Sequence, residues 1–555
     1  MTEEKAAFRA KTETFRIGLI SNKLLLLLSI GLLVTPAVFI ILYAPVYCDA
    51  AYYLSIVELM SEGHKIYEDI TSAYTPLVFY FTLLLKTLFG IGINYRFYLV
   101  VNLLILYLCG YFAYKLAHSF TGKKPLAFLA SWLFILSAYS RGGDAYLLEL
   151  PGVLFGLWAC VLAIHYGKNT YIFLLTGLIA SAAFWSKQYG IGFIPLILIL
   201  IYFTGEHKYK QISLFILGVA VSFIFMAIAL PSVYDNLYNG YGTDAAANDY
   251  YDDKVVRNLF WAFDYYIKRI CPCLLFAPLI PFFKNNTKKE YGYFIFLLSG
   301  FGGFLCQFYF NKGDHYFLYM LPFSSILTAL LIKKIADWKP KLMPAYYLVL
   351  VIMIIRLVNS VYKNQLYYGY IARNERKEQL ILADKIKQHI GRVDASVYIY
   401  DIQLISQYYL TGYKPPKVAG KYDFSFGPLF YNEQLIRTKF NVSDYILRED
   451  INLNWWHLTP EMDSILSGCE KATLKTNQYN LILYDNTSHH ADHFSSFSFP
   501  FGQYQSVVGI ILPERERELR GGKSPPRFSP LRGLPLPPLR GSAPQRPERQ
   551  RLNSD

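Results

Sequence analysis

The stretch "LLLLLSIGLLVTPAVFIILYAPVYCDA", residues 24–50, indicates a membrane-spanning fold, because an unbroken apolar run is followed at once by an acidic side chain. Residues 24–43 are long enough to cross about 30 Å of hydrocarbon as a helix. A cleaved signal peptide is the alternative, since Arg16 and Lys23 precede the run, but the run is too long for one and no small-residue cleavage site ends it. The sequence therefore predicts an uncleaved first membrane span, with Asp49 just beyond it.

The composition extends this prediction to the whole chain. Of the 555 residues, 54% are hydrophobic and only 17% are charged, whereas soluble domains have about 25% charged residues. The net charge of +14 would favour a nucleic-acid partner in a soluble protein. Here Lys and Arg gather in short loops between apolar runs, as membrane orientation requires, so we expect a lipid bilayer and no nucleic acid as partner. The seven Cys are scattered, and the "CPC" at 271–273 lacks a second ligand pair for zinc.

The lysines of the loops also predict the topology. If the apolar segment 74–91 crossed the membrane, the basic loops after it would fall outside and the acidic loops inside, against the positive-inside rule. If it lies on or dips into the outer face, the conflict disappears. We therefore expect a multi-pass protein of the plasma or inner membrane with a cytoplasmic N-terminus and about eleven transmembrane helices: 24–43, 96–117, 125–140, 146–166, 170–186, 190–204, 211–230, 269–283, 291–309, 315–332 and 342–358.

Three domains follow from changes of pattern along the chain. Residues 1–362 carry the spans. Residues 363–512 contain an amphipathic helical pattern at 374–390 and two short buried strand patterns, "ASVYIYD" and "YNLILYD", and are predicted to form a small extracytoplasmic α/β domain. Residues 513–555 are rich in Pro and Arg and lack periodicity, so we expect a disordered tail. A read-through or frameshifted end is an open interpretation of this tail.

Four polar stretches meet at the outer face of this topology. They contain Asp49 in "YCDAAYY", Asp144 in "SRGGDAYLLELP", Lys187 in "FWSKQYG" and His315 in "KGDHYFLYMLP". Each residue alone has an ordinary explanation: Asp49 or Asp144 as a helix cap, Lys187 as a snorkelling side chain, His315 as a polar group at the interface. Charged groups at a membrane boundary are costly unless paired or used. Their location on one face therefore favours a catalytic site.

The same stretches resemble a known family. "CDAAYYLSIVELMSEGHKIYEDITSAYTPLVFY" resembles the first outer loop of the GT-C glycosyltransferases, in particular the protein-mannosyltransferase-like proteins (glycosyltransferase family 39) that include lipid A aminoarabinose transferases. "RGGDAYLLELP", "AAFWSKQYGIGFIP" and "DHYFLYMLPF" resemble later segments in the correct order. The chain departs from the family at Ala50, where many relatives have Glu, and at Tyr74-Thr75-Pro76, where Lys-Pro-Pro is frequent. "NWWHL" at 454–458 has His457 where oligosaccharyltransferases have Asp, so we interpret its tryptophans as core or interface anchors.

The resemblance implies a GT-C transmembrane fold, a polyprenyl-phosphate-linked sugar donor and an acceptor hydroxyl on a protein, lipid A or a glycan at the outer face. An inverting transfer requires a carboxylate that takes the proton of the acceptor, and Asp49 is the candidate. Asp144 would orient the acceptor, pair with Arg141 or help to hold a metal. No cofactor is strictly required, and a divalent metal ion on Asp49 and Asp144 is left open. The remaining candidates are Lys187, His315, Arg141 and Lys86 for the donor phosphate, and Tyr53, Tyr67 and Tyr316 for the substrate.

A transporter or flippase of lipid-linked sugars or polysaccharide is the alternative from another functional class. Such a protein would carry charges in the middle of its spans, and often internal repeats and broken helices. Intramembrane charges are scarce here and no repeated half is found. A glycan ligase or polymerase would differ mainly in its acceptor. No nucleotide-binding glycine motif occurs, which argues against a cytosolic nucleotide-sugar donor.

Overall fold

The computed structural model describes residues 31–487 with gaps, and the architecture below refers to these residues. The gaps are 32, 73, 91–94, 140–142, 144, 238–286, 307–313, 339–343, 345–350, 353, 356, 360–372, 402–403, 425–432, 450–463, 465 and 478. The described residues belong to one compact unit, Met1–Asp492. The predicted span 269–283 and the predicted tail 513–555 lie outside them.

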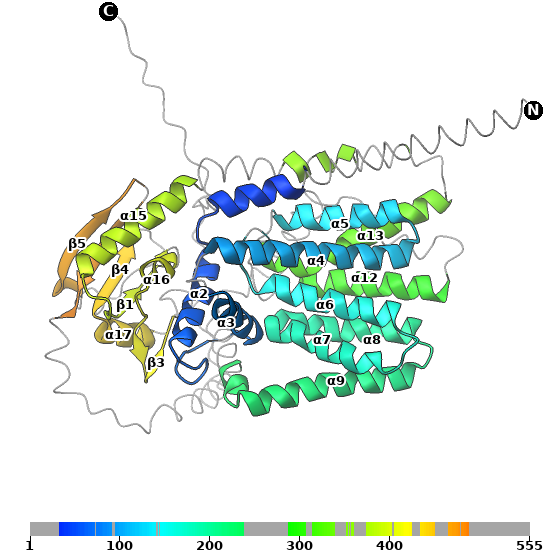
Figure 1. The fold of residues 1–555 in the computed structure, drawn as a ribbon, viewed down its shortest axis with the longest axis horizontal. Helices are drawn as coiled ribbons and strands as arrows, with labels where there is room; N and C mark the ends of the chain where they lie inside the picture. The colour runs from blue at the N-terminus through cyan, green and yellow to red at the C-terminus, as the bar shows by residue number, and fades with distance from the viewer. Residues whose placement is uncertain are drawn as a thin grey trace, which may run out of the picture. The chain divides into compact units, whose positions relative to one another are not determined.

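Most of the described chain is helical, and its apolar helices run lengthwise beside one another (Figure 1). A helix overlaps each predicted span between residues 96 and 332 that the structure describes. These helices are α4 (Tyr95–Thr121), α5 (Lys124–Tyr139), α6 (Glu149–His165), α7 (Ile172–Ser186), α8 (Phe193–Thr204), α9 (Lys208–Ala229), α12 (Lys288–Cys306) and α13 (Phe317–Trp338).

The described residues include three helices that are long and apolar enough to cross a membrane, namely α4, α9 and α13. A bent pair, Leu33–Tyr43 and α2 (Cys48–Ser61), would make a fourth span, but its two halves differ in direction by 63°. Because α2 turns away in this manner, we treat it as lying beyond the first span. The helix α3 (Leu77–Phe89) has 13 residues, about 20 Å of rise, which is shorter than the hydrocarbon core of a bilayer. The eleven-span topology stays a prediction.

The helices α13 and α9 differ in burial, which identifies α13 as a central helix and α9 as a peripheral one. In the apolar window of α13, 94% of residues are buried, whereas in that of α9 only 11% are. The exposed side chains of α9 include Phe225 at 65% and Ile228 at 75% exposure. Such a continuous apolar surface is costly in water, so this face of α9 is suited to a lipid environment. The opposite face packs closely on α7, where a Cβ on Gly177 would lie 2.2 Å from the carbonyl oxygen of Phe215.

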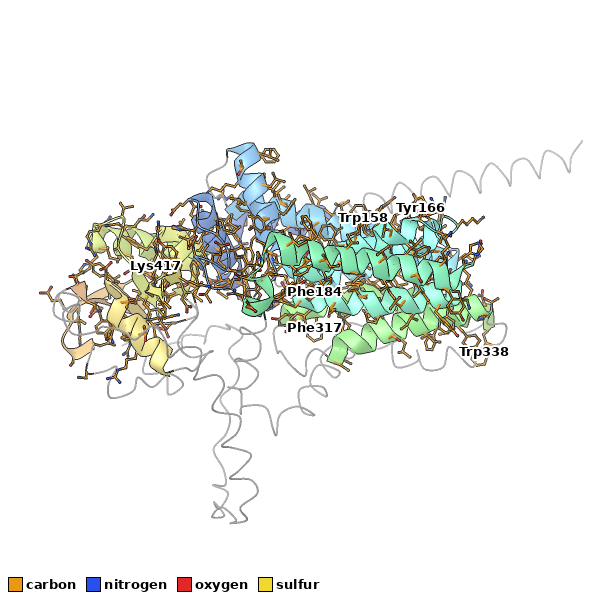
Figure 2. All side chains as sticks on the ribbon, turned by 90° about the horizontal axis from the view of Figure 1, so that it is seen from below. Trp158, Tyr166, Phe184, Phe317, Trp338 and Lys417 are labelled. Atoms are coloured by element: carbon orange, nitrogen blue, oxygen red, sulfur yellow. The ribbon has the colours of Figure 1, made fainter. Side chains whose placement is uncertain are left out.

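Several helices begin or end at the same end of the bundle. The neighbouring helices α6 and α7 are joined by the short connection 166–171, so the start of α6 lies beside the end of α7. Figure 2 shows Phe184, near the end of α7, and Phe317, at the start of α13, toward the same end, with Trp338 at the other. The polar residues at 149, 187 and 315 are therefore brought close together.

Residues 373–487 form the predicted α/β structure. The helix α15 (Arg373–Ile390) and the strands β1 (Val397–Ile399) and β6 (Asn480–Asp485) lie where the sequence patterns predicted them. A four-stranded mixed sheet has the order β1-β4-β6-β5, with β1 and β4 (Tyr445–Glu449) parallel and the other pairs antiparallel. The remaining elements are α16 (Ser406–Thr411), β2 (Lys417–Val418), β3 (Lys421–Tyr422), α17 (Glu433–Val442) and β5 (Glu470–Lys475).

The α/β structure is held to the loop that follows α2. The backbone N–H of Tyr422 donates to the carbonyl oxygen of Asp69 at 2.8 Å, and the N–H of Thr71 donates to that of Tyr422 at 2.9 Å. The Lys421 ammonium donates to the carbonyl oxygen of Tyr67 at 2.6 Å. These bonds fix the loop between α2 and α3, which carries Tyr74. That 363–512 forms a separate domain outside the membrane stays a prediction.

Candidate active site

A buried ion cluster joins three helix ends. The carboxylate oxygen Oε1 of Glu149, the first residue of α6, lies 3.2 Å from Nζ of Lys187 and 3.7 Å from Nε2 of His315. The side chains of Glu149 and Lys187 are 0% and 1% exposed. Neither oxygen of Glu149 has a well-aligned hydrogen bond within the described residues. The carboxylate is therefore held mainly by charge.

Three tyrosine rings surround the Lys187 ammonium. Its Nζ lies 4.0 Å from the ring centroid of Tyr74 and 5.7 Å from those of Tyr53 and Tyr316. It also donates a long hydrogen bond of 3.4 Å to the Tyr53 hydroxyl. The negative faces of aromatic rings attract a cation, and more strongly where water is excluded. The carboxylate and the rings together keep a buried ammonium group in place, and the snorkelling interpretation of Lys187 is wrong.

Asp49 faces the same cluster from α2. It is the second residue of this helix, whose N-cap is Tyr47, and the cap makes no side-chain hydrogen bond. The interpretation of Asp49 as an N-cap is therefore wrong. Desolvation raises the pKa of the Asp49 carboxyl above its usual range, while the positive charges of His315 and Lys187 oppose this shift and Glu149 reinforces it. By accessible surface, Asp49 is partly buried, whereas Glu149 is fully buried.

The turn after α7 explains the position of Lys187. Lys187 leaves the helix in an extended conformation, with φ −158° and ψ 136°, and the short 3-10 helix η1 (Gln188–Gly192) follows. A Cβ on Gly190 would lie 2.1 Å from the carbonyl oxygen of Ala183, so this close approach requires glycine. His315 lies in η5 (Asp314–Tyr316), directly before α13.

The other predicted site residues lie elsewhere. The Lys86 ammonium is 2.7 Å from Oε2 of Glu58 and 2.6 Å from Oγ of Ser61, and these are its polar contacts within the described residues. The buried Tyr67 donates from its hydroxyl to the carbonyl oxygen of Tyr74 at 2.6 Å, so it supports the ring that covers Lys187. Arg141 and Asp144 lie outside the described residues, and their roles stay predictions.

The described residues contain no group of three or more His, Cys, Asp or Glu side chains arranged to hold a metal ion. At Glu149 the position that a cation would take is already occupied by Lys187. The residues described here therefore do not fit a metal, and the predicted pair of Asp49 and Asp144 is left untested because Asp144 lies in a gap.

Glu149 was not predicted from the sequence. It lies in "LLELP" and inside the expected span 146–166, where it was counted as part of an apolar run. One signal could have identified it: a carboxylate within a membrane span is rare and is a functional candidate by default.

The comparisons with known proteins concern the fold. No protein-family model matches the chain, and no curated protein sequence matches it. The crystal structure of ArnT from Cupriavidus metallidurans in the apo state aligns with a TM-score of 0.52 at 10% identity, over 85% of this chain and 99% of that one. The same protein bound to undecaprenyl phosphate aligns with a TM-score of 0.51 at 11% identity, over 84% and 98%. An oligosaccharyltransferase from Archaeoglobus fulgidus, in complex with zinc and sulfate, aligns at 0.49 with 12% identity, over 75% and 68%.

Proposed function

Because the chain has a GT-C superfamily fold, we propose that it is a membrane glycosyltransferase. It transfers a sugar from a polyprenyl-phosphate-linked donor to an acceptor hydroxyl on the outer face of the membrane, with inversion at the anomeric carbon. The solved ArnT structure with undecaprenyl phosphate supports the class of lipid donor. The acceptor hydroxyl belongs to a protein, lipid A or a glycan.

Asp49 acts as the general base in this proposal. The acceptor oxygen attacks the anomeric carbon and forms the new C–O bond, while its proton passes to the Asp49 carboxylate. The bond between the anomeric carbon and the phosphate oxygen breaks, and the polyprenyl phosphate leaves with the electron pair. A phosphate is a good leaving group without protonation, so the site requires a base and cationic stabilisation but no general acid. Desolvation raises the pKa of the Asp49 carboxyl, which increases its affinity for the proton of the acceptor.

Lys187 and His315 stabilise the charge of the leaving phosphate, and Glu149 positions both. In the observed arrangement Lys187 is buried against Glu149 under the Tyr74 ring. In this proposal the donor phosphate displaces the Tyr74 ring to contact the ammonium. Glu149 then holds the Lys187 ammonium in place beside the phosphate through their ion pair. Its negative charge also keeps the donor phosphate from binding too tightly for release.

One observation carries the proposal: a partly exposed acid, Asp49, faces a buried Lys–Glu–His cluster at the end of a GT-C-type helix bundle. A base and a phosphate-binding cation are the two parts that the transfer requires, and Asp49 and Lys187 are close enough for their charges to interact.

The test is mass spectrometry of membrane lipids and glycoconjugates from cells with and without the gene. A transferase predicts that deletion removes one sugar from an acceptor and that the polyprenyl-phosphate sugar accumulates on the outer leaflet. A transporter or flippase predicts accumulation on the inner leaflet. Lipids and glycoconjugates that are identical in both strains would contradict the proposal.

A further inference from the structure

A second polar site lies between α15 and the segment that follows the first apolar helix. A cavity of about 400 Å³ is lined by side chains that include Arg376, Gln379 and Leu380 of α15, Tyr95 of α4 and Tyr409 of α16. None of these residues belongs to the cluster around Glu149. The cavity is therefore distinct from the proposed active site, although its wall residue Val46 is three positions before Asp49.

The walls of the cavity are fixed by hydrogen bonds. The backbone N–H of Val46 donates to Oε1 of Gln379 at 3.1 Å, and Nε2 of Gln379 donates to the carbonyl oxygen of Val46 at 3.3 Å. This two-way pairing is buried. Arg376 and Gln379 are three positions apart on α15, so their side chains share one face of the helix.

Arg376 is the charged side chain among the described residues that line the cavity. Nη1 of Arg376 donates one long hydrogen bond, 3.3 Å, to the carbonyl oxygen of Ala44, and within the described residues Arg376 has no ion pair. The Arg96 guanidinium is close enough to repel its charge. No carboxylate is among the residues that line the cavity. A guanidinium has five donors, and one of those on Arg376 has a hydrogen-bond partner among the described residues.

The position of the cavity indicates the kind of anion. Ala44 directly follows the apolar helix Leu33–Tyr43, and Leu380 on the rim is 48% exposed. Guanidinium groups bind phosphate oxygens in pairs, and tyrosines are typical of the boundary between lipid and water. An anion bound here would lie beside the expected membrane surface with an apolar side chain next to it. We propose that this cavity binds the phosphate group of a membrane lipid head group through Arg376.

The test uses the full-length protein in detergent and two probes, dihexanoyl phosphatidic acid and inorganic phosphate, with binding measured by calorimetry. Loss of a charge-assisted hydrogen-bond pair should weaken binding of the lipid about ten- to a hundredfold in Arg376→Gln. Arg376→Lys keeps the charge but not the paired geometry, so its affinity for the lipid should lie between those of the wild type and Arg376→Gln. Lys377→Gln is the matched control, because it removes the same charge from an exposed neighbouring position on α15.

Several outcomes would overturn the proposal. Equal weakening by Lys377→Gln would mean that the lipid responds to the general charge of the surface. Equal affinity of the wild type for inorganic phosphate and for the lipid would show an anion site with no role for the lipid. No binding of either probe would remove the site altogether. Should Arg376→Gln fail to fold, Arg376→Lys against Lys377→Gln carries the same comparison.

Discussion

Removing the Glu149 charge is the perturbation that probes the buried cluster most deeply. Glu149→Gln keeps the shape of the side chain but removes the carboxylate that lies 3.2 Å from the Lys187 ammonium. The Lys187 side chain is only 1% exposed, so water cannot replace that carboxylate. At an effective dielectric constant of about 20, two unit charges at this distance attract by about 5 kcal/mol. Removing one partner of a buried pair costs about 3–5 kcal/mol, because the other charge is left uncompensated. We therefore expect Glu149→Gln to lower the free energy of unfolding by this amount.

A double-mutant cycle separates this effect from simple damage to packing. Lys187→Met removes the cation and keeps an unbranched chain that can pack against Tyr74, so Glu149→Gln with Lys187→Met should lose much less stability than the sum of the single changes. The assay is equilibrium unfolding of the purified variants in mixed micelles. A coupling free energy of about 3 kcal/mol is expected. If the single variants unfold within about 0.5 kcal/mol of wild type, or if the two changes are strictly additive, Glu149 and Lys187 do not stabilise each other as a buried ion pair.

Three further predictions concern the donor site, the pH dependence and the topology. Lys187→Ala should raise the KM for the donor and lower kcat, whereas Lys86→Ala, which loses only the partner of an exposed carboxylate, should change neither; equal effects would contradict the assignment. Burial raises the pKa of Glu290, but hydrogen bonds and the charges of nearby lysines lower it by more, to about 2 from a usual value of 4.5. The stabilisation from Glu290 is therefore complete above pH 4.5 and is lost as the pH falls toward 2. Glu290→Gln should not show this loss of thermal stability. A variant whose thermal stability falls with pH as that of the wild type does would exclude the effect. Cysteines introduced at positions 93 and 122 should be labelled from outside and inside respectively, and labelling from one side would reject the eleven-span topology.

The sequence predicted most of the described helices, and it singled out three residues that lie near one another in the structure. Apolar runs of membrane length are recognisable one at a time, and Asp49, Lys187 and His315 stand out because each interrupts the end of such a run. The lysines of the loops then placed these ends on one face. In the structure Asp49, Lys187 and His315 lie in one cluster.

The rest depends on distances that no linear pattern contains. Glu149 is one acid in an apolar run, and only the packing of α6 against α7 shows that it meets Lys187. Lys86 has the same charge and a similar boundary position, but its nearest carboxylate happens to be Glu58 on α2. Tyr74 was noted only as a departure from a family pattern, yet its ring covers the Lys187 ammonium at 4.0 Å. In each case the partner comes from another helix or from a loop elsewhere in the fold.

The most direct test of the central claim is sugar transfer by Asp49→Asn. The substitution keeps the size and polarity of the side chain but removes the proton acceptor, and loss of a general base costs about 10²–10⁴-fold in rate. The measurement is transfer from a polyprenyl-phosphate sugar by purified, folded protein in nanodiscs. Glu58→Gln is the matched control, because Glu58 is another acid of α2 and pairs with Lys86. The account predicts that Asp49→Asn loses at least about a hundredfold in kcat while Glu58→Gln stays near wild type. Near-normal transfer by Asp49→Asn would contradict it.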